Sequence, residues 1–248
     1  MSQNLPQLLL AVPDPDTDPA WFGVLSADEW TRHDGFRFER DRLLFRTAHA
    51  LVRHSLSQVS QGQINHIAAA DWVFTTGSHG RPEPAPGLAD GLRFNLSHAH
   101  GLVAVLLHGP HDAGVDVEPC QRDVGFLSIA RFSFAPAELE DVAAQTTLDA
   151  RRQRFFAIWT LKEAYIKARG LGLAMDLSAF AFSFPDALPV RVTFEPRAED
   201  QAERWHFWRD QTETHQIAVA NTDPDARPPV VRWIQPGDFS ERKNPSSR

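Results

Sequence analysis

The segment Leu102–Leu107 constrains the fold most strongly, because every one of its residues is apolar. A short, fully apolar run of this kind is typical of a strand at the centre of a sheet, buried on both faces. The chain has 248 residues, and its 17 phenylalanines and seven tryptophans provide enough bulk to bury such a sheet. We therefore expect a globular protein organised around this strand.

Helical periodicity occurs on both sides of the central strand. Apolar residues recur at helical spacing within Asp41–Ser57, and Arg151–Arg169 is the longest helical segment. Ser26 and Glu29 have the spacing of a capping box, which predicts the start of a short helix. Pro136 is suited to the first turn of a further helix.

Other segments have the composition of strands or loops. Strands are expected at residues 8–12, 114–117, 190–194, 205–208 and 216–220, the last three as an antiparallel meander. Loops rich in proline and glycine are expected at residues 12–16, 76–87 and 223–229.

This order of elements predicts an α+β fold with two comparable halves. We place the halves at residues 1–110 and 111–235, meeting near residues 108–113, although the sequence shows no strong internal repeat. The polar residues 236–248 are expected to form a disordered tail.

Charge and composition exclude several classes of protein. The formal net charge of −7 argues against a general nucleic-acid-binding protein. No apolar run reaches the ~20 residues needed to span a bilayer, and the N-terminus lacks the pattern of a secretory signal. The single cysteine, Cys120, excludes an intrachain disulfide framework and suits a reducing compartment, so we expect a cytoplasmic protein.

One stretch is nevertheless basic. From Arg32 to Arg53 there are six arginines and three carboxylates. This stretch is either a specific anion site or a solvated helix face, and the composition does not decide between the two.

The helix around Trp159–Lys167 places charged residues in unusual positions. Glu163 and Lys167 are four residues apart, so their side chains can meet on one helix face. Lys162 falls within the apolar stripe of the helix, where an unpaired ammonium is costly. We expect Lys162 either to reach solvent or to pair with a carboxylate from another element.

A second group of charges lies in the strand that contains Gly114. Asp116 and Glu118 alternate with apolar residues, so both carboxylates project from the same face. Adjacent carboxylates repel each other unless a cation lies between them, and with Glu163 they would offer three oxygen ligands to a hard divalent metal. The alternative, a strand whose edge simply reaches solvent, is equally compatible with the spacing.

Ser97 and His98 directly precede the central strand, where ligand contacts are common. They are sequence neighbours and seldom able to face each other, so they do not by themselves form a nucleophilic couple. The spacing of the nearby histidines (His98, His100, His108 and His111) matches no standard zinc site.

Five motifs, taken in order, resemble those of the 4′-phosphopantetheinyl transferase family, in its larger pseudo-dimeric form. They are Gly80-Arg81-Pro82, Asn95-Leu96-Ser97-His98, Gly114-Val115-Asp116-Val117-Glu118, Phe134-Ala135-Pro136-Ala137-Glu138 and Trp159 through Lys167. Two positions depart from the family pattern: Arg81 replaces the usual lysine, and Ala135 replaces a serine expected to cap the next helix.

The resemblance implies a fold of two similar halves with the active site in the cleft between them. It implies transfer of 4′-phosphopantetheine from coenzyme A to a serine of an acyl or peptidyl carrier protein, releasing 3′,5′-adenosine bisphosphate. It also implies a cytoplasmic monomer that acts on neither nucleic acid nor membrane. A magnesium-dependent phosphohydrolase with a nucleotide-like substrate is the main alternative, and a catalytically silent carrier-binding module is another.

The resemblance also implies roles for individual residues. Asp116, Glu118 and Glu163 would hold Mg²⁺, and Glu163 would take the proton from the carrier serine unless a metal-bound hydroxide does so. Lys167 and His98 would contact the phosphates and assist catalysis. The nucleotide end of coenzyme A would be anchored by Arg81, Ser97 and an arginine of the basic stretch, with Arg46 the first candidate and Arg32 and Arg37 as others.

Overall fold

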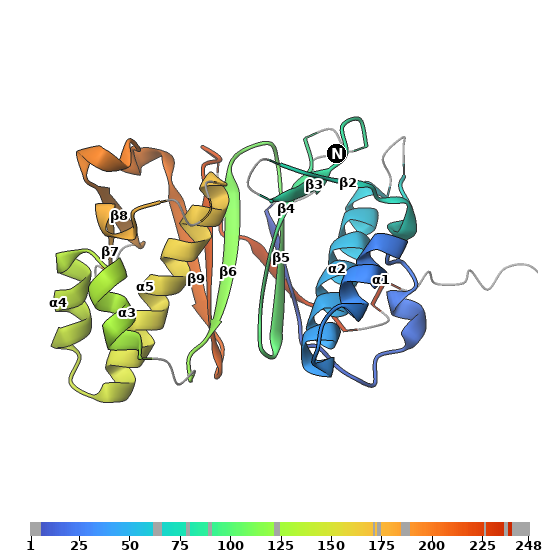
Figure 1. The fold of residues 1–248 in the computed structure, drawn as a ribbon. Coiled ribbons are helices and arrows are strands. Elements are labelled where there is room, and N and C mark those ends of the chain that lie inside the picture. Colours follow the sequence, from blue (N-terminus) through green and yellow to red (C-terminus); the bar gives the residue numbers. More distant parts are fainter. Residues whose placement is uncertain are drawn as a thin grey trace, which may run out of the picture.

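The computed structural model describes residues 6–61, 66–77, 80–88, 91–121, 125–170, 172, 175–184, 189–225, 227–235 and 238–239. Within this part of the chain, two sheets meet in the middle of the molecule and helices cover their outer sides (Figure 1). The mixture of helices and strands confirms the predicted α+β class. None of the described helices is long and apolar enough to cross a membrane.

The first sheet has the strand order β11-β1-β5-β4. Its strands are β1 (Gln7–Ala11), β4 (Arg93–Ala99), β5 (Leu102–His108) and β11 (Val230–Trp233). Helices α1 (Ala27–Asp34) and α2 (Glu39–Ser60) cover its outer face.

The second sheet has the strand order β6-β10-β9. Its strands are β6 (Ala113–Pro119), β9 (His206–Gln211) and β10 (His215–Asn221). The helices on its outer side are α3 (Phe126–Ser133), α4 (Pro136–Ala144) and α5 (Leu148–Arg169).

Smaller elements complete the described chain. Two hairpins are formed by β2 (Phe74–Thr76) with β3 (Pro82–Pro84) and by β7 (Phe180–Ser183) with β8 (Arg191–Phe194). Short 3₁₀ helices span Pro19–Phe22, Ala69–Asp71, Leu177–Ala179, Pro196–Ala198 and Ala202–Arg204.

Strand β5 confirms the prediction of a central strand. It lies between β1 and β4, and all seven of its residues are buried. Because side chains alternate along a strand, Val103, Val105 and Leu107 pack in the core beneath α2. Leu102 and Leu106 face the other way and pack with the apolar residues of β6 and β10. The central strand therefore joins the two halves through one shared core.

The edges of the two sheets meet where β4 runs beside β6. Asn95 and Ser97 project from one face of β4 toward β6. The Asn95 side-chain oxygen accepts a hydrogen bond from the backbone N–H of Val115 at 2.9 Å, and Ser97 Oγ accepts one from that of Val117 at 3.3 Å. Side chains thus replace the backbone pairing that is missing between the sheets, and Ser97 is brought beside Asp116.

Gly114 allows α5 to lie directly against β6. A Cβ atom at this position would stand 2.3 Å from the Ala164 carbonyl oxygen and 2.4 Å from the Ala168 nitrogen. Both distances are too short for any side chain, so only glycine permits this approach of helix and strand. The close packing places Glu163 and Lys167 next to the acidic face of β6.

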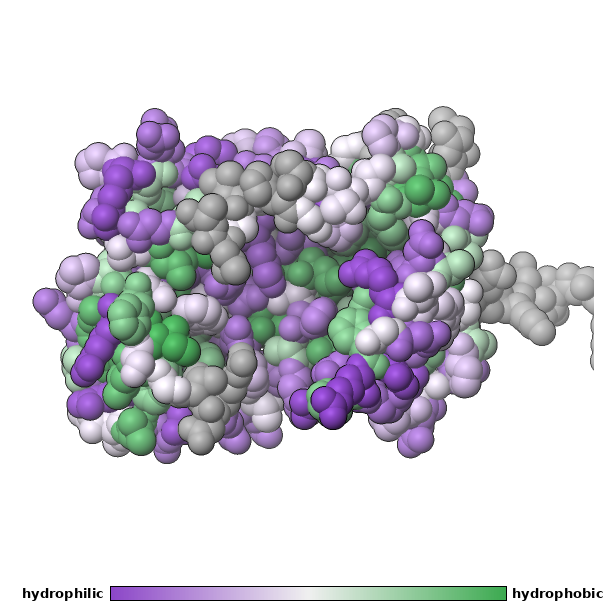
Figure 2. All heavy atoms as spheres, viewed as in Figure 1, coloured by the Kyte–Doolittle hydropathy of each residue, from purple (hydrophilic) through white to green (hydrophobic). Residues whose placement is uncertain are grey.

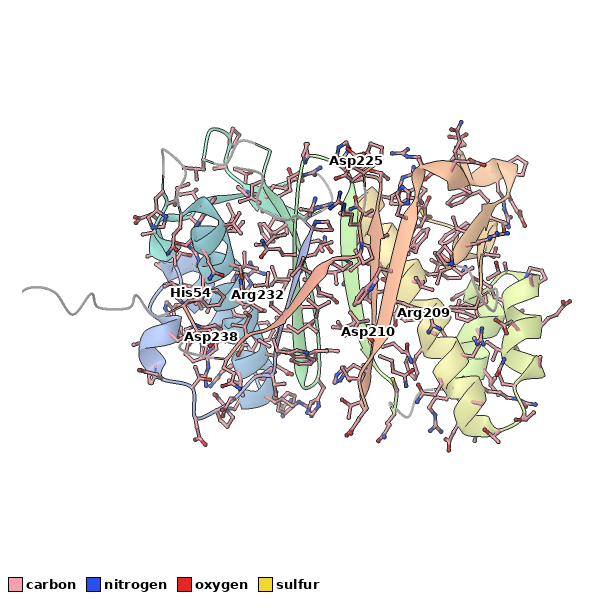
Figure 3. The ribbon with its side chains drawn as sticks, turned by 180° about the vertical axis from the view of Figure 1, so that it is seen from behind. His54, Arg209, Asp210, Asp225, Arg232 and Asp238 are labelled. Atoms are coloured by element: carbon pink, nitrogen blue, oxygen red, sulfur yellow. The ribbon has the colours of Figure 1, made fainter. Side chains whose placement is uncertain are left out.

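Several features differ from the sequence-based expectations. Strand β11 pairs in parallel with β1, so residues 230–233 belong to the first sheet although we expected them in the second half. Figure 3, seen from behind, shows β11 with Arg232 crossing to the first half, whereas Arg209 and Asp210 lie on β9 in the second. A boundary at residue 110 therefore separates the two halves except for β11, which follows this boundary but belongs to the first sheet.

The local differences have simple causes. The proline-rich stretch 76–87, expected to be a loop, contains β3, whose ladder tolerates proline because the hairpin has only two strands. The antiparallel pairing of β9 with β10 is confirmed, but β8 pairs with β7 and not with β9, so the expected three-stranded meander is wrong. Helix α3 was not predicted. The expected disordered tail lies outside the described residues apart from residues 238–239.

Candidate active site

Two pockets formed by the described residues meet at a common wall between the halves. The first pocket has a volume of about 1120 Å³ and the second about 760 Å³. Leu96, His98, Glu163 and Lys167 line both pockets. Figure 2 shows that the surface is recessed between the two halves, with hydrophilic and hydrophobic residues side by side.

Asp116 lies at the base of the first pocket and is almost fully buried. Its Oδ1 accepts hydrogen bonds from Lys167 Nζ at 2.7 Å and from Ser97 Oγ at 2.9 Å. Its Oδ2 is buried and has no hydrogen-bond partner among the described residues. A buried carboxylate oxygen without a donor is costly, so this atom is suited to a cation.

Glu163 is half-buried on α5 and lines both pockets. Burial raises the pKa of its carboxyl group, the negative charge of Asp116 raises it further, and Lys167 opposes both effects. The helix spacing predicted that Lys167 would pair with Glu163. The Lys167 ammonium binds Asp116 instead. Glu163 therefore faces the pockets as a carboxylate that holds its proton more tightly than usual.

Glu118 lines the first pocket beside Asp116 and Glu163. Its Oε1 accepts a hydrogen bond from the indole N–H of Trp159 at 3.2 Å. Among the described residues, no three His, Cys, Asp or Glu side chains are grouped tightly enough to hold a metal ion. The three predicted ligands share a pocket without converging on one point, and Lys167 binds one oxygen of Asp116 while the other has no hydrogen-bond partner among the described residues.

His98 stands at the junction of the two pockets with its side chain exposed at their mouth. The surrounding protein lowers the pKa of its imidazole by limiting hydration, and the neighbouring Lys167 ammonium lowers it further. A neutral imidazole can donate a hydrogen bond from one nitrogen and accept one at the other.

The second pocket is basic and aromatic. The cationic or titratable bases that line it are Arg32, His49, Arg81, His98 and Lys167, with Phe36 and Phe45 among its apolar residues. The Arg32 guanidinium lies 5.3 Å from the centre of the Phe45 ring. This composition suits an anionic ligand with a planar group, and it favours the anion-site interpretation for the part of the basic stretch near Arg32.

Two predicted anion-binding residues have unexpected contacts. The Arg81 guanidinium donates to the carbonyl oxygens of Phe94, Ala113 and Lys167 at 3.3–3.4 Å, so it joins β4, β6 and α5 as well as lining the second pocket. Within the described chain, Arg46 lines neither pocket. Its guanidinium instead lies 5.0 Å from the ring centre of Phe22 and 3.3 Å from Glu39.

Sequence reasoning missed His49 and the polar role of Trp159. Trp159 was named only as the start of a sequence motif, and nothing in the local pattern showed that its N–H would meet Glu118. One indirect feature of the sequence pointed to His49: it lies on the predicted helix that carries the basic stretch.

Comparison with known proteins identifies the kind of protein to which this site belongs. Residues 112–220 match the family described as the 4′-phosphopantetheinyl transferase superfamily. The chain is 33% identical to 4′-phosphopantetheinyl transferase HetI of Nostoc sp., over 70% of each chain. It is 30% identical to a 4′-phosphopantetheinyl transferase of Bacillus subtilis, over 71% of this chain and 74% of that one. A phosphopantetheinyl transferase of Thraustochytrium sp. is 29% identical over 84% of this chain and 75% of its own.

These relatives and the matching site define an enzyme of the transferase class. The chain belongs to the 4′-phosphopantetheinyl transferase superfamily. It transfers phosphopantetheine to carrier proteins, as the sequence motifs predicted.

Proposed function

We propose that Asp116, Glu118 and Glu163 bind Mg²⁺ and that coenzyme A spans the wall between the two pockets. The observation that carries this proposal is the meeting of Asp116, Glu163 and Lys167 at a junction shared by an acidic and a basic pocket. The unpartnered Oδ2 of Asp116 fits an oxygen-seeking divalent cation. When bound, Mg²⁺ would neutralise the charge of the pyrophosphate.

The side chains at the junction then have distinct tasks. Glu163 takes the proton from the carrier serine. The serine oxygen forms a bond to the phosphorus nearest the pantetheine, and the bond to the bridging pyrophosphate oxygen breaks. Lys167 and His98 donate hydrogen bonds to the phosphate oxygens, on which charge develops. The products are holo carrier protein and 3′,5′-adenosine bisphosphate.

The basic second pocket accommodates the nucleotide end of coenzyme A. Arg32 and His49 line it and are better placed for the nucleotide than Arg46, while Arg37 lines neither pocket within the described residues. Arg81 and Ser97 border the site and also form hydrogen bonds that link neighbouring elements of the fold. They therefore contribute both to binding and to the fold.

We further propose that the two halves form a pseudo-dimer, which their similar construction supports. Each has a long helix of 22 residues, α2 or α5, packed on a sheet, which is mixed in the first half and antiparallel in the second, and the two sheets share a common core. The active site lies at their junction. We expect the enzyme to act as a monomer, because both halves of the site come from one chain. We also expect it to be cytoplasmic.

The acidic pocket is the side from which the carrier serine approaches. Helix α3 follows β6 and packs through Phe126 on Phe155, which in turn stacks on the pocket residue Trp159. Phe132 of α3 is 89% exposed, and the neighbouring Arg131 is also exposed. An apolar side chain beside a basic one suits an acidic carrier protein with an apolar contact surface.

One experiment tests the function. The purified protein is incubated with coenzyme A, Mg²⁺ and an apo acyl or peptidyl carrier protein, and the carrier is then weighed by mass spectrometry. A mass gain equal to one phosphopantetheine group is expected, and it should disappear when a chelator removes the metal. Release of phosphate from nucleotides with no modified carrier would support the phosphohydrolase alternative, for which the comparisons give no support.

A further inference from the structure

Glu29 is a buried acid that the mechanism above does not use. Sequence analysis identified it as part of a capping box, and the structure confirms that its carboxylate accepts the backbone N–H of Ser26 at 2.8 Å. The same carboxylate accepts hydrogen bonds from His49 Nδ1 and from Arg53 Nε, both at 2.8 Å. Burial alone would raise the pKa of Glu29, but the hydrogen bonds from His49 and Ser26 and the charge of Arg53 lower it to about 2. Glu29 is therefore a fixed negative charge at neutral pH.

His49 connects this buried carboxylate to the second pocket. Its ring stacks on Phe45 at 4.0 Å between centres, and the exposed remainder of its side chain, 21%, lines the pocket. Since Nδ1 is bound to Glu29, the ring can offer a ligand only its Nε2 edge. No described residue forms a hydrogen bond with that edge.

We propose that Glu29 is a positioning residue for nucleotide binding, holding His49 so that its Nε2 donates a hydrogen bond to a phosphate group in the second pocket. The proposal rests on the proposed function, because it takes coenzyme A as the ligand of that pocket.

The physical reason is the number of protons on the ring. A neutral imidazole that gives its Nδ1 proton to Glu29 carries no proton on Nε2 and cannot donate to a phosphate. Binding a phosphate therefore requires the doubly protonated ring, and the ionised carboxylate of Glu29 stabilises that cation. Because the backbone N–H of Ser26 and the guanidinium of Arg53 hold the Glu29 carboxylate, the ring is kept facing the pocket.

The other charged groups around the pocket set the background for this effect. Arg32 on α1, Arg81 before β3, His98 on β4 and Lys167 on α5 are basic, and Glu163 on α5 is acidic. Most of these groups oppose a further positive charge on His49, which makes the negative charge of Glu29 necessary. Removing the charge of Glu29 should therefore weaken nucleotide binding.

The test measures binding of 3′,5′-adenosine bisphosphate by isothermal titration calorimetry, without carrier protein and without turnover. Glu29→Gln keeps the shape of the side chain and removes its charge, so we expect a Kd about tenfold higher than that of the wild type, the size of one charge-assisted hydrogen bond. In steady-state assays the KM for coenzyme A should rise while kcat stays unchanged.

Two further variants separate positioning from folding. Ser26→Ala removes the cap that Ser26 Oγ provides to the Glu29 N–H but leaves His49 untouched, so it should lower the melting temperature and leave the Kd unchanged. His49→Gln should raise the Kd about as much as Glu29→Gln, and the double variant should raise it no further, because both changes remove the same hydrogen bond. The double-mutant comparison remains informative even if Glu29→Gln lowers stability.

Adenosine 5′-monophosphate shows which phosphate is involved. A loss of affinity for the bisphosphate alone would place His49 at the 3′-phosphate, and an equal loss for both nucleotides would place it at the 5′-phosphate; either result supports the proposal. An unchanged Kd for a folded Glu29→Gln protein would overturn it. If the wild type bound no 3′,5′-adenosine bisphosphate at all, the proposed function would be wrong, and not only the role of Glu29.

Discussion

The two sides of helix α5 differ in how completely their polar groups are satisfied. On the side away from the pockets, the Lys162 ammonium is fully buried and binds Glu138 at 2.8 Å. It also donates to the carbonyl oxygens of Leu177 and Phe180. Glu138 in turn accepts hydrogen bonds from two backbone N–H groups. Every donor and acceptor of this ion pair therefore has a partner.

The side of α5 that faces the pockets is arranged differently. Lys167, five residues further on, is 29% exposed and shares a single oxygen of Asp116 with Ser97. The other oxygen of Asp116 is buried without a partner among the described residues. Glu163 lies near Asp116, so that two negative charges repel each other.

This difference separates the part of the helix that holds the fold together from the part that binds ligands. A buried ion pair with complete hydrogen bonding fixes the rotation of α5 against α4 and β7. That rotation determines where Glu163 and Lys167 point. The unsatisfied groups on the pocket side are tolerated because the other side fixes the helix, and they are the groups that we propose bind the metal and the phosphates.

Glu163→Gln should produce the largest effect, a loss of activity without a loss of stability. Removing the proposed base is expected to slow phosphopantetheine transfer by about 10²- to 10⁴-fold, the usual contribution of general base catalysis. The melting temperature should not fall. The measurement is the initial rate of carrier modification, followed by mass spectrometry. Glu140→Gln, an exposed acid on α4, is the matched control and should retain full activity. A Glu163→Gln enzyme with wild-type rate would show that this side of the helix is not catalytic.

Lys162→Met should have the reverse effect, with a large loss of stability. The substitution leaves the Glu138 carboxylate buried without its cation, which typically costs about 3–5 kcal/mol. Urea unfolding at pH 7 measures the loss. The double variant Lys162→Met with Glu138→Gln should recover part of it, because glutamine has no charge to bury and still offers one acceptor. If the double variant were as unstable as the sum of the single changes, the cost would not come from the unpaired charge.

The sequence predicted one half of this comparison better than the other. Periodicity showed that Lys162 lies in an apolar stripe and needs a partner, and the structure confirms this need. The partner itself, Glu138, lies on another helix, and no local pattern indicates how two helices pack. On the pocket side, the spacing of four residues predicted a contact between Glu163 and Lys167. Gly114 allows β6 to lie next to the helix, however, and Lys167 pairs with Asp116 of that strand.

The fold was also predicted only in part. The central strand β5 and the long helices have strong periodicity, so they were found with nearly correct bounds. Strand β11 was missed because it has only four residues and follows two prolines. Its pairing with β1, more than 200 positions earlier in the chain, depends on tertiary packing that a short segment does not encode.

Gly114→Ala tests whether the contact between α5 and β6 links the two sides. The added Cβ would clash with backbone atoms of Ala164 and Ala168, which cannot move without shifting the helix. We expect a loss of about 1–3 kcal/mol in the free energy of unfolding, together with reduced transfer activity. Gly109→Ala is the control, because no described atom lies within 4 Å of the Cβ it would add. It should change stability by less than about 0.5 kcal/mol. A stable and fully active Gly114→Ala protein would show that the position of α5 is not critical.

The smallest expected effect is the dependence of stability on pH that Glu163 causes. Because burial and Asp116 raise the pKa of Glu163, the folded protein binds this proton more tightly than the unfolded chain does. Wild-type stability should therefore fall as the pH rises from 4.5, the ordinary value, through the raised pKa. Glutamine avoids this cost, so Glu163→Gln should be more stable than the wild type at pH 7, and the difference should shrink toward pH 4.5. Urea unfolding of both proteins across this range measures it, and the opposite contribution of Glu29, common to both, cancels. A Glu163→Gln protein less stable than the wild type at pH 7 would mean that attraction to Lys167 outweighs the repulsion from Asp116, and that the pocket side of α5 also holds the fold together.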